Sequence, residues 1–373
     1  MPPVRLEELV RPAVRGLAPY EPGKPTDELR RELGVERIVK LASNEGPYGP
    51  FPSAREAMAR AAAELNRYPD PGAYRLRAAL AERHGVPLDA VALGAGTDGI
   101  VDCLSQAFLD PGDEIVCGWP SFASYPTYAR KMGAVPRLVP LREHRYDLEA
   151  LLEAVGPRTK IVYVCNPNNP TGTMTTRSEL DSYFERVPEH VLTVIDQAYF
   201  EYVEDPAYPD AVEEYLKAGR RVLVLRTFSK IYGLAGLRVG YGVGPAPLVA
   251  ALAKTRRAFD VDTLAQEAAL ASLGEESEIE RRRRLNSAGR RQLADVLAQA
   301  GLAPVGPAVA NFLYVDLGQD ARRLFDRLLR EGVIVRPLHA FGAPTGVRVT
   351  VGTPDDHAFL ASALSRALSP SPA

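Results

Sequence analysis

Short apolar runs alternate with amphipathic segments through the middle of the chain. Runs such as 91–94 (VALG), 114–118 (EIVCG), 160–165 (KIVYVC), 191–196 (VLTVID) and 221–226 (RVLVLR) have the length and β-branched content of buried strands. Between several of them lie segments with helical periodicity, such as GIVDCLSQAFL and TRSELDSYFERV. Strands that alternate with helices predict an α/β fold, with a mainly parallel sheet between two helical layers.

The pattern changes towards both ends of the chain. Residues 1–50 are rich in proline and glycine and predict an extended N-terminal arm. Residues 51–260 contain the strand and helix alternation and predict a large domain. Residues 261–373 contain a long helical region followed by strand-like runs such as NFLYVDL and GVRVTV. We therefore expect a smaller α+β domain at this end.

Composition and short motifs exclude several classes of protein. Lys and Arg number 45 against 47 Asp and Glu, so the formal net charge is -2 and predicts no basic surface for nucleic acid or an anionic membrane. Three cysteines without a C-x-x-C pair and five histidines without an H-x-x-x-H pair predict neither a disulfide scaffold nor a metal site. The first residues, MPPVRLEELVRP, lack the apolar core of a signal peptide, and no run approaches the about 18 apolar residues of a membrane span. These features favour a cytoplasmic protein.

An arginine cluster, ERRRR at 280–284, stands in the long helical region. Such a cluster has two interpretations, a phosphate-binding patch or the solvated face of a helix. Charge runs on helices most often face solvent, and we expect this one to do so.

The segment 94–99 (GAGTDG) follows a predicted strand and opens a predicted helix, so its backbone N–H groups can bind an anion at the helix N-terminus. It matches G-x-G-x-x-G, which also occurs in nicotinamide-dependent dehydrogenases and in plain turns. A dinucleotide site needs a carboxylate at the end of the next strand. That strand ends instead in Trp119-Pro120-Ser121-Phe122. An aromatic group there favours a flat ring stacked at this place over NAD.

Four further segments follow later strands or turns, at the edge where open α/β sheets bind ligands. They are NPNNPTG at 166–172, DQAY at 196–199, TFSK at 227–230 and the GLR that ends at Arg238. The lysine of TFSK is informative because only seven of the 45 basic residues are lysines. A primary amine can lose its proton and attack a carbonyl, whereas a guanidinium cannot.

Together these segments offer the groups that a pyridine aldehyde phosphate needs. Lys230 offers the amine that bonds to the aldehyde, and Asp196 offers a carboxylate for the ring nitrogen. Asn169 and Tyr199 can hydrogen-bond the phenolic oxygen, and Phe122 can stack on the ring. The phosphate would be surrounded by Gly96, Thr97, Asp98, Thr227, Ser229 and Arg238.

This set of segments, in this order, resembles the fold-type I, pyridoxal-phosphate-dependent aminotransferases of class I and II. Within them the chain is most similar to the histidinol-phosphate aminotransferases, from the Y-x-P-G-K-P motif at 20–25 through NRYPD at 66–70 to R-V-T-V-G-T at 348–353. The resemblance implies that L-histidinol phosphate and 2-oxoglutarate are converted to imidazole-acetol phosphate and glutamate in histidine biosynthesis. The nearest alternative is an aromatic amino-acid aminotransferase, because those enzymes share almost every motif. A dehydrogenase that uses the glycine loop is a distant one.

The resemblance also implies roles for single residues. Lys230, Asp196 and Tyr199 would be catalytic, and Tyr68 would reach the phosphate of a partner subunit in a homodimer with shared active sites. The bond Asn169–Pro170 would be cis. The substrate would be bound by Tyr20, Asn44, Asn169, Arg336 and Arg348.

The chain departs from the family's pattern at a few places. F-N-V-N of many members is Phe259-Asp260-Val261-Asp262 here, and the stacking tyrosine is Phe122. Two acids beside a phosphate site would be unfavourable if they pointed inward and harmless if they pointed to solvent. The effect of Asp260 and Asp262 therefore depends on the tertiary structure.

Overall fold

The computed structural model describes residues 5–18 and 26–369. Within them the largest sheet has seven strands in the order β2-β8-β7-β6-β5-β3-β4. β8 runs antiparallel to both of its neighbours, and all other neighbouring pairs are parallel. The strands are β2 Val91–Gly94, β3 Glu114–Trp119, β4 Val135–Pro140, β5 Thr159–Cys165, β6 Leu192–Asp196, β7 Val222–Thr227 and β8 Gly240–Val243.

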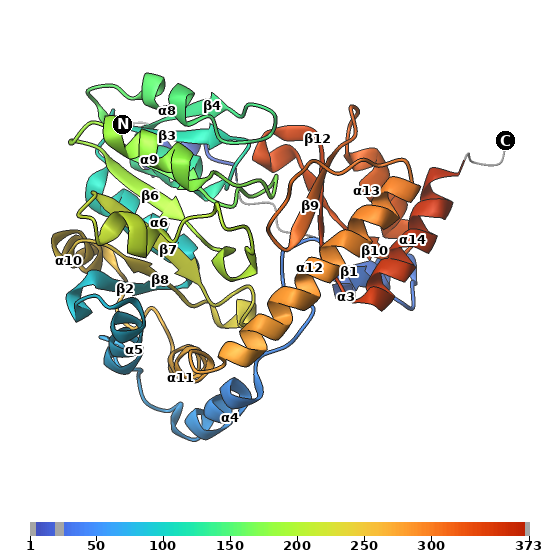
Figure 1. Ribbon diagram of the computed structural model, residues 1–373, viewed down its shortest axis with the longest axis horizontal. Coiled ribbons are helices and arrows are strands. Elements are labelled where there is room, and N and C mark those ends of the chain that lie inside the picture. Colours follow the sequence, from blue (N-terminus) through green and yellow to red (C-terminus); the bar gives the residue numbers. More distant parts are fainter. Residues whose placement is uncertain (1–4, 19–25, 370–373) are drawn as a thin grey trace.

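Helices cover both faces of this sheet, which confirms the expected α/β fold (Figure 1). The central strands are buried on both faces, and this explains their continuous β-branched runs: Val116, Val162, Val194 and Val224 are all fully buried. α6 packs against α10 and α7, and α8 packs against α9. The helices of this part are α4 Pro52–Ala61, α5 Tyr74–His84, α6 Gly96–Phe108, α7 Ser124–Met132, α8 Leu148–Ala154, α9 Arg177–Arg186, α10 Ala246–Thr255 and α11 Thr263–Ser272.

A second, smaller core lies around an antiparallel sheet in the order β11-β12-β9. The N-terminal part of the chain joins it, because β1 pairs in parallel with β10. Leu29 of α3 belongs to a buried cluster with Leu329 and Ile334. The elements are α3 Thr26–Leu33, β1 Val39–Lys40, β9 Phe312–Asp316, α13 Arg322–Arg330, β10 Val333–Ile334, β11 Arg336–Leu338, β12 Ala343–Thr350 and α14 Pro354–Leu368. The short helices α1 Leu6–Leu9 and α2 Pro12–Arg15 precede them in the chain, and α2 contacts α7 beside the large sheet.

The long helix α12 (Glu276–Gln299) connects the two cores and runs diagonally across Figure 1. Ile279 near its start belongs to the core of the large sheet, whereas Leu293 and Leu297 belong to the smaller core. α11 packs against α4, and its Ala265, Ala268 and Ala269 belong to the large core. This packing favours a boundary between the two domains within α12. The domain boundary expected at residue 260 stays a prediction.

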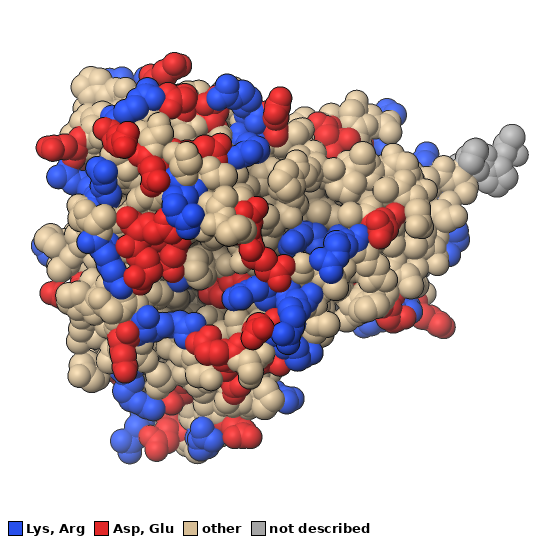
Figure 2. Space-filling view, in the orientation of Figure 1, with Lys and Arg blue, Asp and Glu red and all other residues tan. Residues whose placement is uncertain are grey.

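The surface carries both signs of charge side by side (Figure 2). This mixture accords with a formal net charge of -2. No helix in the described ranges is long and apolar enough to span a membrane. The same residues contain no group of three or more His, Cys, Asp or Glu that could hold a metal ion.

Candidate active site

Lys230 stands just beyond the carboxyl end of β7, and its amine lies 5.6 Å from the ring centroid of Tyr199. Burial lowers the pKa of this amine to about 8, and the positive charges of Arg348 and Arg238 act in the same direction. The negative charges of Glu45 and Asp196 partly oppose them. A larger fraction of the amine is therefore neutral near pH 7–8 than in an ordinary lysine, whose pKa is about 10.4. A neutral amine is the form that attacks a carbonyl or accepts a proton.

Asp196 is the last residue of β6 and is 3% exposed. Tyr125 donates its hydroxyl hydrogen to Oδ2 at 2.8 Å, and the Ala198 N–H donates to Oδ1 at 3.1 Å. Burial raises the pKa of the carboxyl to about 6, while these hydrogen bonds and the charge of Lys230 lower it. The carboxylate thus stays largely ionised at neutral pH, in a place where a positive ring nitrogen would find a buried counter-charge.

Aromatic rings surround this carboxylate. Tyr125 stacks on Tyr163 with centroids 4.3 Å apart and planes at 10°. Phe122 packs edge-on against Tyr125 at 5.4 Å. Tyr199 packs edge-on against Phe312 at 5.1 Å, and its hydroxyl accepts a hydrogen bond from Nδ2 of Asn44 at 2.9 Å. Phe122 and Tyr199 are therefore fixed near Asp196 and Lys230, as a site for a flat ring requires.

An anion cradle lies where α6 begins. Nη1 of Arg238 lies 3.5 Å from Oγ of Ser229, and Oγ1 of Thr227 accepts from the N–H of Ser229 at 3.1 Å. Gly96 has φ +73°, and a Cβ on it would lie 2.7 Å from Nη2 of Arg238. A guanidinium, two hydroxyls and the helix N-terminus thus meet at one place, which is the donor set that binds a phosphate.

The other two residues expected in the cradle lie at the first turn of α6. Thr97 is buried, and a Cβ on Gly240 of β8 would lie 2.6 Å from its backbone nitrogen. The carboxylate of Asp98 accepts hydrogen bonds from Ser124 and from Tyr128, the latter at 2.6 Å. Asp98 thereby joins the start of α6 to α7.

Two buried arginines face each other across β11 and β12. Arg336 and Arg348 are directly paired in the antiparallel register, so their side chains leave the sheet on the same face. Arg348 donates from Nη1 to Oδ1 of Asn169 and from Nη2 to the carbonyl of Ala42 at 2.7 Å. Both guanidinium carbons lie within 5.8 Å of the Phe341 ring centroid. This arrangement suits an anionic group of a substrate.

Asn44 connects β12, the strand that carries Arg348, to Tyr199. Its backbone N–H donates to Oγ1 of Thr350 at 3.0 Å, and its Nδ2 binds Tyr199. Its φ is +55°, which asparagine tolerates better than most residues. The segment around residue 44 therefore forms one wall of the site.

Not every residue singled out in the sequence takes part in the site contacts above. Tyr68 is 81% exposed and stacks on Phe259 at 4.5 Å. Tyr20 lies outside the described residues. Asp260 does point inward: its side chain is 3% exposed and accepts from the backbone N–H of Ala95 at 3.0 Å, beside the cradle at the start of α6. Its charge is paired with Arg257 at 2.6 Å. Asp262 caps α11 by accepting from the N–H of Ala265 at 2.8 Å.

The prediction of a cis peptide bond at Asn169–Pro170 is wrong. Asn166–Pro167 is cis, and Asn169–Pro170 is not among the cis bonds of the described residues. Two Asn-Pro pairs in one motif, CNPNNPTG, make this assignment ambiguous from sequence.

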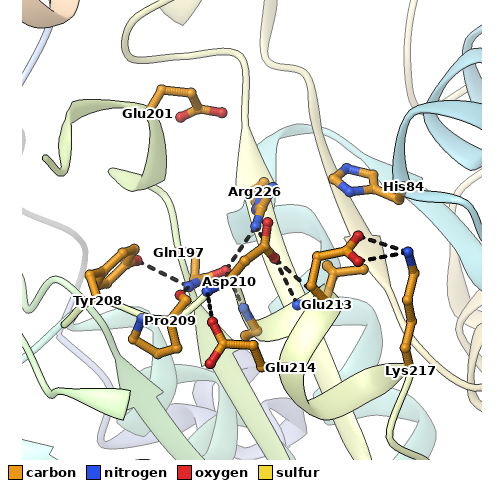
Figure 3. A network of polar contacts seen from close by, with 12 residues as sticks. His84, Gln197, Glu201, Tyr208, Pro209, Asp210, Glu213, Glu214, Lys217 and Arg226 are labelled. Carbon is orange, nitrogen blue, oxygen red and sulfur yellow. Dashed lines mark hydrogen bonds and ion pairs between the residues drawn. The ribbon is translucent and has the colours of Figure 1, made fainter. Parts of the chain in front are cut away.

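The sequence analysis did not identify a network of polar residues next to the strand ends that carry the site (Figure 3). Arg226, which is 4% exposed, donates to Oε1 of Gln197 at 3.1 Å and to Oδ1 of Asp210 at 2.7 Å. Nε2 of Gln197 in turn donates to the hydroxyl of Tyr208 at 3.1 Å, and Tyr208 donates to the carbonyl of Asn166 at 2.6 Å. This network joins the ends of β5, β6 and β7. Arg226 stands at the end of an apolar run, directly before TFSK. A charged residue at this place is the signal in the sequence that could have indicated the network.

The fold and the site define an aminotransferase. Residues 36–364 match the family model described as aminotransferase class I and II, so the chain belongs to this family, as its motifs predicted.

The chain is similar to aminotransferases whose substrates are named. The chain is 46% identical over 352 residues to a histidinol-phosphate aminotransferase of Moorella thermoacetica, covering 94% of this chain and 91% of that protein. It is 48% identical over 353 residues to an aromatic amino acid aminotransferase of Thermobifida fusca, covering 94% and 95%. A crystal structure of histidinol-phosphate aminotransferase from Sinorhizobium meliloti in complex with pyridoxal-5'-phosphate superimposes with a TM-score of 0.86 at 29% identity, covering 96% and 97%.

Proposed function

We propose that this protein binds pyridoxal 5'-phosphate and transfers the amino group of L-histidinol phosphate to 2-oxoglutarate. The products would be imidazole-acetol phosphate and glutamate, in histidine biosynthesis. One observation carries the proposal: an amine of lowered pKa, a buried carboxylate and an anion cradle meet at the ends of adjacent strands. The names of the Moorella and Sinorhizobium relatives support the substrate and the cofactor.

The residues present fit the cofactor. Gly96 leaves room at the cradle that a Cβ would fill, and Ser229 and Arg238 converge beside it. Asp196 would hold the proton of the ring nitrogen, and Asn169 and Tyr199 would donate to the phenolic oxygen. When bound, the cofactor supplies an electron sink for the bond that breaks at the substrate's α-carbon.

The chain's own groups would then move the protons. Nζ of Lys230 would take the proton from the α-carbon of the substrate and later return a proton to the cofactor's aldehyde carbon. Arg348 and Arg336 would hold the phosphate of histidinol phosphate in one half of the reaction and a carboxylate of 2-oxoglutarate in the other.

A second candidate, transamination of aromatic amino acids, is favoured by the Thermobifida relative. The aromatic rings of Phe312 and Phe341 beside Arg348 are compatible with it. The cofactor and the proton transfers are the same in both candidates, which differ only in the donor's side chain.

A panel of half-reactions distinguishes the two candidates. The cofactor-loaded protein is mixed in turn with histidinol phosphate, histidine, phenylalanine and tyrosine, and the absorbance of the bound cofactor is followed. We expect the fastest loss of absorbance with histidinol phosphate. Faster conversion of the free aromatic amino acids would show the substrate assignment to be wrong and leave the cofactor assignment standing.

Replacing Lys230 tests the cofactor assignment itself. Lys230→Ala is expected to abolish turnover, because no other group would move the proton at the α-carbon. Borohydride treatment of the wild-type protein with pyridoxal 5'-phosphate should leave a pyridoxyl label on Lys230, detectable by peptide mass. Near-normal turnover of the variant, or a label found only on other lysines, would contradict the proposal.

We also propose a homodimer with shared active sites. The exposed ring of Tyr68, stacked on Phe259, is accessible to a second copy of the chain. The cytoplasmic location expected from the sequence remains a prediction.

A further inference from the structure

The arginine cluster 280–284 separates into two pairs. Arg281 and Arg284 are exposed and pair with glutamates of the same helix at 2.7 and 3.0 Å. The basic side chains of α12 are all arginines, and blue side chains are visible along this helix in Figure 2. Arg282 also pairs with Glu278 of the same helix, at 3.0 Å, but it is only 6% exposed, and Arg283 is partly buried. The expectation of a solvated cluster is therefore right for one pair and wrong for Arg282.

Arg282 binds two backbone segments beside the site. Nη1 donates to the carbonyl of Ile231, the residue after Lys230, at 3.0 Å. Nη2 donates to the carbonyl of Gly49 at 2.8 Å. The guanidinium carbon lies 4.3 Å from the ring centroid of Phe51, which is fully buried. One planar group thus joins the turn that carries Lys230 to the segment 44–51.

These two segments also touch each other. The N–H of Gly233 donates to the carbonyl of Lys230 at 3.0 Å, which closes the turn 230–233. A Cβ on Gly233, whose φ is +72°, would lie 2.6 Å from the carbonyl oxygen of Gly49. The segment 44–51 begins with Asn44, the residue that binds Tyr199. A shift of either segment would therefore change where the lysine amine stands relative to the rest of the site.

The neighbouring residue on α12 binds the segment that follows Tyr199. Nε of Arg283 donates to the carbonyl of Glu201 at 2.6 Å, two residues beyond Tyr199. α12 itself is anchored in both cores through Ile279 and Leu293. The helix therefore provides a firm support for the turns that carry the lysine and the tyrosine.

We propose that Arg282 is a positioning residue for the aminotransferase reaction. It fixes the turn that carries Lys230 against the segment 44–51. The inference rests on the proposed function, because it takes Lys230 as the residue that bonds to the cofactor and moves the proton. A guanidinium suits this task since its two Nη atoms donate in one rigid plane to two carbonyls. A lysine ammonium keeps the charge and lacks the planar fork, so it should not replace Arg282.

The test compares Arg282→Lys and Arg282→Met with Arg284→Met, a control on the solvent face of the same helix. Hydrogen exchange of peptides covering 44–51 and 228–235 is measured by mass spectrometry on the full chain without added cofactor. Both Arg282 variants should exchange at least about fivefold faster in these two segments. Their kcat should fall about tenfold to a hundredfold with a KM for the amino donor within about threefold of wild type. Arg284→Met should match wild type in every measurement.

A purely structural role predicts a different result. If Arg282→Lys lowers the Tm but leaves kcat and the exchange of both segments as in wild type, the proposal is wrong. Equal losses in Arg284→Met would also contradict it. Should Arg282→Met not fold, Arg282→Lys decides, because it retains the charge and most of the stem. Failure of the proposed function looks different: wild-type Lys230 would take no pyridoxyl label, while the exchange difference at Arg282 would persist.

Discussion

At the scale of single residues, Lys230 differs in its surroundings from the five other lysines that the structure describes, because only its amine has a clearly lowered pKa. Burial lowers the pKa of its amine to about 8, and the guanidinium of Arg348 is the next contribution. Arg348 is thus expected to act twice, as an anion-binding residue and as a charge that keeps the amine neutral. Arg336, its neighbour across the strand pair, is not among the leading contributions to this pKa.

Removing the charge of Arg348 should raise the pKa of Lys230. A nearby positive charge disfavours the protonated amine, so Arg348→Gln favours protonation and moves the midpoint to higher pH by about half a pH unit or more. The measurement is the rate at which added pyridoxal 5'-phosphate labels Lys230 as a function of pH, with borohydride trapping. Arg336→Gln serves as the control and should leave the midpoint nearly unchanged. A midpoint that stays or falls in Arg348→Gln would contradict the electrostatic role.

At the scale of elements, α7 provides the hydroxyl that keeps Asp196 ionised. Tyr125 on α7 donates to Asp196 on β6, and this hydrogen bond lowers a pKa that burial has raised to about 6. The contact depends on the packing of α7 against the sheet, and no motif around Tyr125 indicates it. The sequence therefore identified the carboxylate but not the residue that sets its protonation.

Tyr125→Phe should weaken catalysis most at low pH. Without this donor the pKa of Asp196 rises further, so a smaller fraction of the carboxylate is available for the ring nitrogen. We expect kcat to fall about tenfold and the acidic limb of the pH–rate profile to move to higher pH. Tyr163→Phe, which removes a buried hydroxyl from the ring stacked on Tyr125, should leave the profile in place. Identical profiles for the two variants would disprove the role of Tyr125.

Gly96 in the first turn of α6 has two separable reasons to be glycine: its φ is +73°, and it closely approaches Arg238. Gly112, in the turn between α6 and β3, has only the first reason, since its φ is +91° and open space surrounds it. Alanine at either position should cost about 1–3 kcal/mol of stability through backbone strain. Only Gly96→Ala should also weaken binding of pyridoxal 5'-phosphate, by about tenfold or more, because the added Cβ would displace the guanidinium of Arg238 from the phosphate. Fluorescence titration with the cofactor measures this, and equal affinities in both variants would exclude a role for the cradle.

At the scale of the whole molecule, two cores meet at the site. The sheet of the large core carries Asp196 and Lys230, and the small sheet carries Arg336 and Arg348. The proposed dimer adds a third contribution, Tyr68 of a second copy. The site is therefore sensitive to how these parts are held together, by α12 within a chain and by association between chains.

Mixing two inactive variants tests the shared site. Lys230→Ala and Tyr68→Ala subunits, unfolded and refolded together, should form mixed dimers in which one site has both native residues. With equal amounts and random pairing, roughly a quarter of all sites become native. Activity measured after mixing should rise accordingly, with light scattering confirming the dimer. No gain over the separate variants in a verified mixed dimer would place Tyr68 outside the partner's site.

Much of the fold was predictable because the central strands are buried on both faces. Their continuous apolar runs mark the sheet, and the reactive segments that follow β5, β6 and β7 are brought together by the parallel arrangement itself. Lys230, Asp196 and Asn169 could thus be identified together from local patterns. The structure of the N-terminal arm was harder to predict. β1 and α3 pack on the small core through only a few apolar residues, so the sequence of the arm has no clear hydrophobic periodicity.

The sequence by itself determined the chemical groups and their order along the chain, since local periodicity sets the strands and the strand ends set the site. Only the tertiary structure decided how these groups behave. The lowered pKa of Lys230, the hydrogen bond from Tyr125 to Asp196 and the burial of Arg282 arise from contacts between segments far apart in sequence. Burial and charge act through space, and a linear pattern contains no distances.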